Sequence, residues 1–266
     1  MARSCSVRGE MLGQGGAARM LEVPVEVPVN FVYATLPYAV LMATPADFED
    51  FAVGFSVTEG IVRNAAEIRG IAVSVVPRGV VVDVDLVPDA LRGHLTRRRN
   101  MAGRTGCGLC GIESLDQLPA VRPVMPGPAV GWPAIRRALV GLEEMQPLHR
   151  ATRAVHAAAW CAPDGTILLV REDVGRHNAL DKLVGGCLRA GYVAQGGFVV
   201  LTSRCSFEMV EKAAAFGAAT VVAISAPTSL AIERAEALGV RLVAVARPDG
   251  AIGFTALSGA ARDAVA

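Results

Sequence analysis

The sequence is poor in aromatic residues and has almost no excess of charge. Aromatic side chains make up only 5% of the 266 residues although 52% are hydrophobic, so the core must consist mainly of Val, Leu, Ile and Ala. The formal net charge is +1, which argues against general nucleic-acid binding, because that binding depends on a large basic excess. The length allows one or two domains with a large core.

Signals for membranes and secretion are also lacking. No stretch approaches the ~20 consecutive apolar residues that are needed to cross a bilayer. Residues 1–10 carry positive charge, but no apolar run follows them, so we expect no secretory signal. We therefore expect a cytoplasmic protein without membrane contact, in which the six cysteines stay reduced. Four of them are isolated in the sequence: Cys5, Cys161, Cys187 and Cys205.

The second half of the chain has a regular alternation of elements. Apolar periodicity predicts helices over 133–145, 178–190, 206–216 and 229–238, and strands over 155–161, 166–170, 198–202, 220–225, 241–246 and 251–256. This alternation predicts an α/β fold in which helices cover both faces of one sheet. Ligands of such folds gather at the carboxyl ends of the strands.

The first half is typical of a smaller α+β unit. Residues 1–20 lack periodicity and are expected to form a mobile tail. Two hairpins follow, the second around residues 77–79, with one helix between them. Thr44 is the expected cap of that helix, which places Phe48, Phe51, Ala52 and Phe55 on one face. We expect an α+β domain over 21–131 that ends in a mobile cysteine loop, and a second domain over 132–266.

Cys107 and Cys110 form the one cysteine motif, and four glycines surround them within residues 103–111. Between Leu91 and Pro133 the apolar residues follow neither the helical nor the strand period. A loop of this length is usually functional or disordered. Glycine makes the backbone permissive, so both thiols should be reachable. Arg104 and the arginine run at 97–99 supply positive charge that favours the reactive thiolate.

Several functions fit a single cysteine pair. A structural zinc site usually has two such doublets, so zinc would need a dimer or distant ligands. A G-x-G-x-x-G pattern runs through Gly106, Gly108 and Gly111, but no apolar strand precedes it, which excludes a dinucleotide site. A thiol–disulfide oxidoreductase pair and two incidental thiols both remain open.

Five segments together resemble one family, the FdhD proteins, which are formate dehydrogenase accessory sulfurtransferases. They lie in the expected order and the resemblance covers about residues 22–256. The segments are FAVGFSVTEG at 51–60, TGCGLCG at 105–111, REDVGRHNALDK at 171–182, SRCSFEM at 203–209 and APTSL at 226–230.

The resemblance implies a sulfur carrier. A cysteine desulfurase would pass sulfur to Cys107 as a persulfide, with Cys110 assisting or relaying. The sulfur would then go to bis-molybdopterin guanine dinucleotide before that molybdenum cofactor enters apo formate dehydrogenase. The resemblance also implies a homodimer and a cytidine-deaminase-like αβα fold for 132–266. Deamination itself is excluded, because His156 is not part of an H-x-E motif and no P-C-x-x-C follows.

The candidate cofactor-binding residues lie in loops at the expected carboxyl edge. Arginine suits phosphate geometry, an acid can accept from the edge of guanine, and a helix start can hold phosphate. These considerations select Asp173, Arg176, His177, Ser203, Arg204, Pro227 and Thr228. The resemblance adds a guanine-dinucleotide segment at Val245, Ala246, Arg247, Pro248, Asp249 and Gly250, although the family commonly has an aromatic residue where Val245 stands. GDP would mimic that end of the cofactor. The alternative function is a non-catalytic chaperone that binds and delivers the cofactor.

Overall fold

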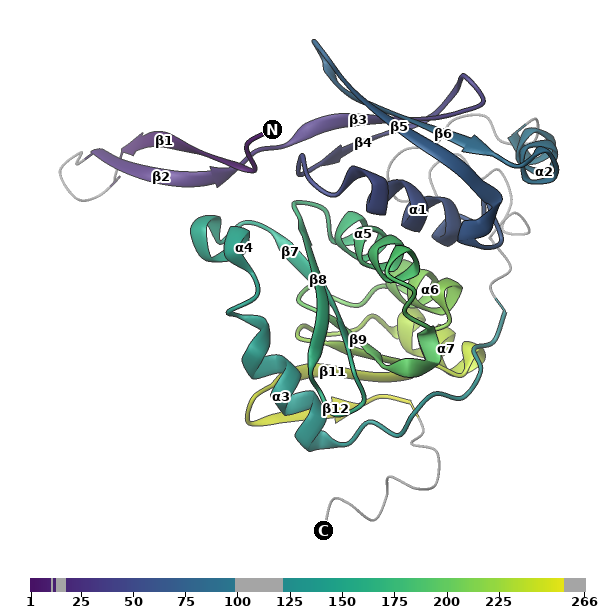
Figure 1. The fold of residues 1–266 in the computed structure, drawn as a ribbon. Coiled ribbons are helices and arrows are strands. Elements are labelled where there is room, and N and C mark those ends of the chain that lie inside the picture. Colours follow the sequence, from purple (N-terminus) through teal and green to yellow (C-terminus); the bar gives the residue numbers. More distant parts are fainter. Residues whose placement is uncertain (11, 13–17, 99–121, 256–266) are drawn as a thin grey trace.

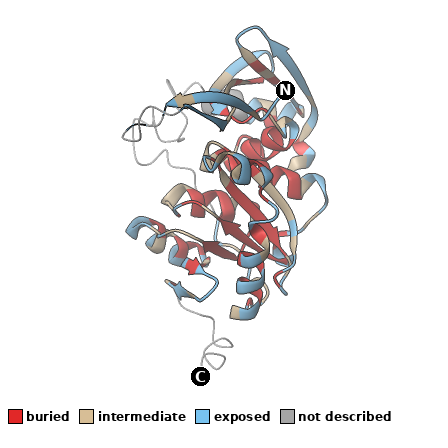
Figure 2. Cartoon of the chain, turned by 90° about the vertical axis from the view of Figure 1, so that its left-hand side faces the viewer, coloured by how far each residue is buried: buried red, intermediate tan, exposed pale blue. Residues whose placement is uncertain are grey.

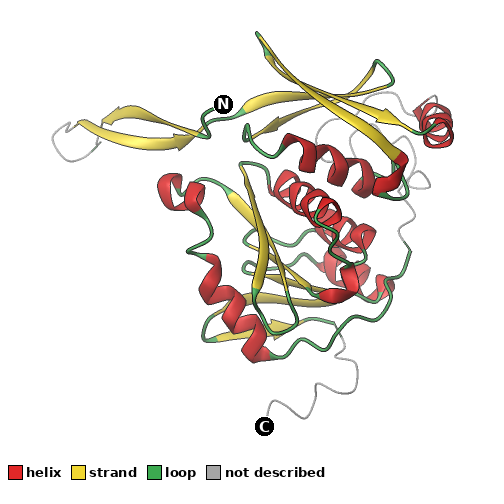
Figure 3. Cartoon of the chain, viewed as in Figure 1, coloured by secondary structure: helices red, strands yellow, loops and turns green. Residues whose placement is uncertain are grey.

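The computed structural model describes residues 1–10, 12, 18–98 and 122–255. Its strands form a two-stranded ribbon, a four-stranded sheet and a six-stranded sheet, in that order along the chain. Figure 1 shows the two larger sheets with helices between them, and Figure 3 shows the same arrangement by element type. The α/β fold class is therefore confirmed.

The four-stranded sheet is built from the two predicted hairpins. Its strands are β3 (Val27–Tyr33), β4 (Leu36–Ala43), β5 (Ile68–Val76) and β6 (Gly79–Leu86), in the order β4-β3-β6-β5. Helix α1 (Phe48–Thr58) packs on one face of this sheet. Phe31 of β3 stacks on Phe55 of α1 with ring centroids 4.8 Å apart, and it meets Phe51 edge-on at 4.9 Å. The predicted apolar face of this helix is thus confirmed.

The six-stranded sheet follows the predicted alternation closely. Its strands are β7 (His156–Cys161), β8 (Ile167–Asp173), β9 (Phe198–Leu201), β10 (Thr220–Ala223), β11 (Arg241–Arg247) and β12 (Gly250–Gly253), in the order β12-β11-β10-β9-β7-β8. Strands β9, β10 and β11 are parallel, and β7 is antiparallel to both β8 and β9. Strand β8 therefore runs in the same direction as β9, β10 and β11.

Helices cover both faces of this sheet, as predicted. Helices α5 (Arg176–Arg189), α6 (Phe207–Phe216) and α7 (Ser229–Leu238) pack on one face, and α3 (Trp132–Leu142) packs on the other. Trp160, Leu183 and Met209 belong to the core on the first side, and Ile135 and Phe198 to the core on the second. Figure 2 shows that buried residues concentrate in these strands and inner helices.

Helices α1 and α5 join the two sheets through an unusually close crossing. A Cβ atom added to Gly54 of α1 would lie 1.7 Å from the Asp181 carbonyl oxygen, and one added to Gly185 of α5 would lie 1.8 Å from the Asp50 carbonyl oxygen. Only glycine allows two backbones to come this close. The two sheets consequently share one helical layer, and the boundary between 131 and 132 stays a prediction.

One ribbon and two helices differ from the sequence-based expectations. Residues 1–20 are not without regular structure, because β1 (Ser4–Glu10) and β2 (Ala18–Pro24) pair as an antiparallel ribbon that extends from the body (Figure 1). Helix α2 (Pro88–Arg98) runs into the region where we expected no helix, and α4 (Pro147–Thr152) was not predicted. Few of their described apolar side chains are buried, which accords with the weak periodicity of their sequences. Two short 3-10 helices at Ala65–Glu67 and Ala194–Gly196 complete the described elements.

The predicted cap of α1 is also wrong. The helix begins at Phe48, and its N-cap residue is Asp47 with φ of 55°, whose side chain makes no capping hydrogen bond. Thr44 is fully buried and its hydroxyl accepts a hydrogen bond from Val174 N at 3.1 Å. The threonine therefore contacts the end of β8 in the other sheet instead of the helix that follows it.

Candidate functional site

The predicted cofactor-binding residues meet at one edge of the six-stranded sheet. Strands β8, β9, β10 and β11 all end at this edge, and the loops that leave them carry residues 173–178, 203–206, 225–228 and 245–250. Backbone hydrogen bonds link neighbouring loops: Thr228 N donates to Cys205 O at 3.0 Å, and Val245 N donates to Ser225 O at 3.2 Å. We call this the carboxyl edge. The structure brings the residues together, and their role in binding stays a prediction.

Asp173 is committed to contacts within the protein. Its Oδ1 accepts from Gly175 N at 2.8 Å and from Asn178 Nδ2 at 2.9 Å, and its Oδ2 accepts from Thr44 N at 3.0 Å and from Lys182 Nζ at 2.6 Å. Its side chain and that of Lys182 are both 0% exposed. Because these bonds use all the lone pairs of the carboxylate, Asp173 joins the two sheets and has no acceptor left for a guanine edge.

The guanidinium groups of Arg176 and Arg204 are not paired with a carboxylate within the described residues. Within the described residues neither forms an ion pair, whereas Arg171 and Arg189 both bind the Asp50 carboxylate. The Nε atom of Arg176 is buried and has no hydrogen-bond acceptor there. Arg176 is the first residue of α5, whose N-cap Gly175 offers no side-chain cap, and Arg204 lies just before α6. Helix starts carry partial positive charge, so this part of the edge favours an anion.

His177 is paired with an acid that we did not predict. Its Nε2 lies 3.1 Å from Glu208 Oε2, and the Ser206 hydroxyl donates to the same oxygen at 3.1 Å. The hydrogen bond from His177 is the main reason that the pKa of Glu208 is lowered from its ordinary value, against the opposing effect of burial. Glu208 lies in the first turn of α6, where a carboxylate is favourable.

His156 is a further residue at this edge that was not among the predicted binding residues. It is the first residue of β7, and it pairs across the ladder with Asp173. Burial lowers the pKa of its imidazole from the ordinary value, and the positive charge of Arg176 lowers it further. The ring makes no hydrogen bond within the part of the chain that the structure describes. The sequence signal for it was its position at a strand start beside the cofactor loops.

The segment from Val245 to Gly250 contains a bulge. The register of β11 against β12 shifts between Ala244 and Arg247, and Val245 has φ of 52° with its side chain 39% exposed. A β-branched residue in this region is strained, and such strain concentrates at functional positions. The Arg247 guanidinium donates to the carbonyl oxygens of Ile224 and Ala246, and Arg136 of α3 donates to Pro248 O at 3.0 Å. The bulge is thus held firmly at the carboxyl edge.

The other predicted residues of the edge mainly shape its loops. Ser203 is almost fully buried and its hydroxyl donates to Arg204 O at 2.9 Å. Thr228 caps α7, because its Oγ1 accepts from Ala231 N at 3.3 Å. Pro227 pairs with Cys205 in an isolated β-bridge, and Ala246 is buried. Ser203 and Pro227 thus help to fix the loop that carries Arg204.

Cys107 and Cys110 lie outside the described residues, as do the zinc and disulfide alternatives that depend on them. Cys161, Cys187 and Cys205 are buried, and burial raises the pKa of each thiol to about 12. Since the thiolate is the nucleophilic form, these three cysteines are inert at neutral pH. Cys5 in the ribbon is exposed.

The chain that follows the cysteine segment is fixed at the opposite edge of the six-stranded sheet. Val124 N donates to the carbonyl oxygen of Leu238, the last residue of α7, at 2.9 Å. The Arg241 guanidinium, at the start of β11, donates to Val130 O. Residues 122–131 therefore lie along the amino ends of β10 and β11, across the sheet from Arg176 and Arg204.

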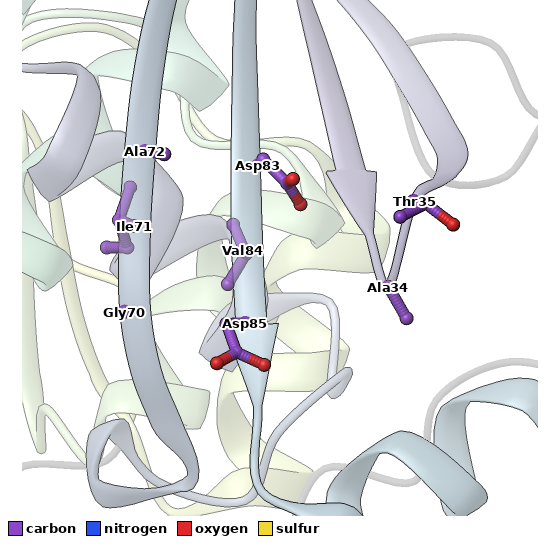
Figure 4. Close-up of a pocket in the computed structure, with 8 residues that line it drawn as sticks. All are labelled: Ala34, Thr35, Gly70, Ile71, Ala72, Asp83, Val84 and Asp85. Atoms are coloured by element: carbon purple, nitrogen blue, oxygen red, sulfur yellow. The ribbon is translucent and has the colours of Figure 1, made fainter.

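A pocket of about 420 Å³ lies elsewhere, on the four-stranded sheet (Figure 4). It is lined by Ala34, Thr35, Gly70, Ile71, Ala72, Asp83, Val84 and Asp85, none of which we predicted as a site residue. Asp85 is already paired with Arg69 at 2.7 Å. Among the described residues no group of three or more His, Cys, Asp or Glu side chains could hold a metal ion, and no helix is long and apolar enough to span a membrane.

The sheet order and the cationic carboxyl edge define an α/β protein of the type that binds ligands where its strands end. The chain belongs to the FdhD/NarQ family, whose model matches residues 24–261. A relative from Agrobacterium fabrum, named sulfur carrier protein FdhD, is 52% identical over 230 residues, or 85% of this chain and 84% of that protein. A relative of the same name from Variovorax paradoxus is 47% identical over 234 residues, or 88% of this chain and 84% of that protein.

The fold also matches a solved structure. A crystal structure from Desulfotalea psychrophila, described as a formate dehydrogenase accessory protein, superposes with a TM-score of 0.76 at 25% identity. The match covers 96% of this chain and 98% of that one. The family resemblance drawn from the five sequence segments is therefore confirmed.

Proposed function

We propose that this chain is a sulfur carrier that serves formate dehydrogenase, with Cys107 as the residue that holds the sulfur. The names of its relatives and of the similar crystal structure support this role. The observation that carries the assignment to Cys107 is the state of the other thiols, because burial removes Cys161, Cys187 and Cys205 from nucleophilic chemistry. Of the cysteines that remain, only Cys107 and Cys110 stand in the motif that resembles the family.

The proposed chemistry begins with thiol exchange. The Cys107 thiolate attacks the terminal sulfur of a persulfide on a cysteine desulfurase, and the desulfurase thiolate leaves, so the step is redox-neutral. For release, the Cys110 thiolate attacks Cys107 Sγ, which expels hydrosulfide and leaves a Cys107–Cys110 disulfide. An external dithiol then supplies the two electrons that restore both thiols.

The client of this chemistry is bis-molybdopterin guanine dinucleotide, and its guanine nucleotide end is the part that the carboxyl edge would hold. Arg176 and Arg204 have free donors for phosphate, and Val245 is displayed on the bulge that the Arg247 contacts hold in place. Asp173 is omitted from this set because its carboxylate is fully used within the protein. GDP is the corresponding soluble probe, and we expect the carrier to act as a cytoplasmic homodimer.

The same edge supports a second candidate, a chaperone that binds the cofactor and moves no sulfur. Reconstitution of formate dehydrogenase from apoenzyme, cofactor, desulfurase and cysteine separates the two. If the chain is a sulfur carrier, the Cys107→Ser variant leaves formate dehydrogenase assembled with cofactor but inactive. The matched control, Cys205→Ser, supports an active enzyme. If Cys107→Ser supports full activity while Arg204→Gln does not, the chaperone is correct and the carrier is not.

A further inference from the structure

The position of His156 in β7 places its side chain on the face of the sheet that α5 covers. Side chains alternate between the two faces along a strand, and Ala158 and Trp160 of β7 belong to the core on the α5–α7 side. His156, two residues before Ala158, is therefore on the same face. Its ladder partner Asp173 is on that face too, because it binds Asn178 and Lys182 of α5.

The charges that act on His156 come from several elements. Besides burial, Arg176 on α5, His149 on α4 and Arg204 before α6 lower the pKa of its imidazole, whereas Asp173 on β8 raises it. The Asp173 charge is already balanced by Lys182 at 2.6 Å. Glu208 of α6 also acts electrostatically on Arg176, but its carboxylate is hydrogen-bonded to His177 and Ser206, so the cationic groups still outnumber the acids around His156.

Unused hydrogen-bond donors accompany this charge. The Nε of Arg176 is buried without an acceptor, although buried polar groups are normally satisfied. By contrast, Arg171 is paired with Asp50 at 2.5 Å and Arg234 with Glu211 at 2.7 Å. An acceptor with several oxygens would complete the cluster, and an oxyanion is the ligand with that chemistry.

We propose that His156, Arg176 and Arg204 bind one phosphate-type oxyanion together, and that His156 takes up a proton when the anion binds. The inference rests on the proposed function, because the anion would be a phosphate of the guanine dinucleotide end of the client. His156 would thus act as a proton-linked binding residue that ties retention of the client to pH.

The direction of the coupling follows from the surroundings. Without the anion, burial and the neighbouring cations keep the pKa of His156 low, so the ring is neutral at neutral pH. A bound dianion cancels the repulsion from the two arginines and accepts a charge-assisted hydrogen bond from the imidazolium. The pKa of His156 therefore rises in the complex, and affinity weakens as the pH rises through that new value. Each unit of rise corresponds to about a tenfold change in affinity.

The test uses the full chain and inorganic sulfate, whose charge is constant over the pH range of histidine titration. The chain has four histidines, so the His156 ring signal is assigned in NMR spectra by its loss in His156→Gln. We expect saturating sulfate to raise the pKa of His156 by about one unit or more, with proton uptake. Sulfate affinity should then fall about threefold to tenfold between pH 6 and pH 8 in the wild type, whereas it should be nearly flat in His156→Gln.

The control is His149→Gln, which changes a histidine of the same cluster whose Nδ1 lies 3.2 Å from Val155 O. This variant should keep the pH dependence. Competition between GDP and sulfate should show that a nucleoside diphosphate uses the same site, and sulfate binding that GDP does not displace would indicate an adventitious ion only. The inference is overturned if sulfate leaves the His156 titration unchanged, or if His156→Gln keeps the wild-type pH profile. Sulfur loading of Cys107 is measured separately, so either failure leaves the carrier function standing.

Discussion

At the scale of single residues, the structure separates acids and bases that hold the protein together from those that are free to bind. Asp173 and Lys182 form a fully buried ion pair, and both also bind the Thr44 backbone in the segment that leads into α1. Lys212 is a second such residue, because it binds Asp181 of α5 and Glu59 after α1. The attraction of Asp181 and Glu59 raises the pKa of Lys212 although burial opposes it.

The Asp173 pair gives a direct prediction of stability. Asp173→Ala should lower the free energy of unfolding by about 3–5 kcal/mol, because it leaves the Lys182 charge buried without a partner. Urea unfolding followed by circular dichroism measures this loss. Arg204→Ala is the control and should change stability by no more than about 0.5 kcal/mol, as expected for an unpaired surface side chain. A stable Asp173→Ala protein with weakened GDP binding would instead support the original prediction of a base-binding aspartate.

The sequence could place these residues in the correct loop but could not assign their roles. Asp173 and Arg176 lie three positions apart at the same strand end, and both suit a polar ligand. Their difference arises because Thr44 and Lys182, distant in sequence, saturate one of them. Likewise, Glu208 was missed because its pairing with His177 joins the starts of two different helices.

At the scale of elements, the crossing of α1 and α5 depends on two glycines. Gly185→Ala places a methyl group against the Asp50 carbonyl, where a Cβ would lie 1.8 Å away, so the helices must separate. We expect a loss of roughly 2–4 kcal/mol, as for severe overpacking of a core. Gly93→Ala in α2 is the matched control, because nothing lies within 4 Å of a Cβ there.

In that control, removal of a helical glycine should be neutral or stabilise by up to about 1 kcal/mol. Thermal unfolding of both variants checks the pair of predictions. Equal behaviour of the two would mean that the helices are not in contact as described.

Element boundaries were predictable where apolar periodicity was strong. The strands and helices of the six-stranded sheet agree with the sequence-based ranges to within a few residues, because each packs against a continuous core. The prediction failed for Thr44, whose local sequence is typical of a helix cap, because a contact with Val174 in the other sheet takes its hydroxyl. It also failed for α2, since Ala90 is its one buried residue among those described.

At the scale of the whole molecule, buried thiols predict how stability varies with pH. The pKa of Cys161, Cys187 and Cys205 is about 12 in the folded protein against an ordinary 9.0. Between these values the folded state binds more protons than the unfolded state. The contribution of these thiols to stability is therefore fully present below pH 9 and is lost as the pH rises above it. Each thiol contributes up to about 1.4 kcal/mol per pH unit in this range.

The unfolding midpoint in urea should therefore fall between pH 9 and pH 11. Cys187→Ala is expected to reduce the slope of this fall by about one third between pH 9 and pH 10, because one of the three buried thiols has been removed. Above pH 10 the buried Tyr33 and Lys212, whose pKa values are also raised, add to the slope. A midpoint that is unchanged over this range would show that the three thiols are not buried in the folded protein.

The overall arrangement makes sulfur transfer a problem of distance. The chain that follows the cysteine segment is fixed at the amino ends of β10 and β11, and the unpaired arginines lie at the carboxyl edge. Sequence analysis could identify the arginines and the cysteine motif through the family resemblance, but it could not show that residues 122–131 and the arginines lie at opposite edges of one sheet. Either the cysteine segment reaches across within one chain, or the client is shared between two chains of the expected dimer.

Whether Cys107 carries sulfur is tested most directly by the mass of the peptide that contains it. The full chain is incubated with a cysteine desulfurase and cysteine, alkylated without reduction, digested and weighed. We predict that the Cys107 peptide gains the mass of one sulfur atom, that peptides with Cys161, Cys187 and Cys205 gain none, and that dithiothreitol removes the added mass. A Cys107 peptide with no added sulfur under conditions in which the desulfurase itself is persulfidated would contradict the account.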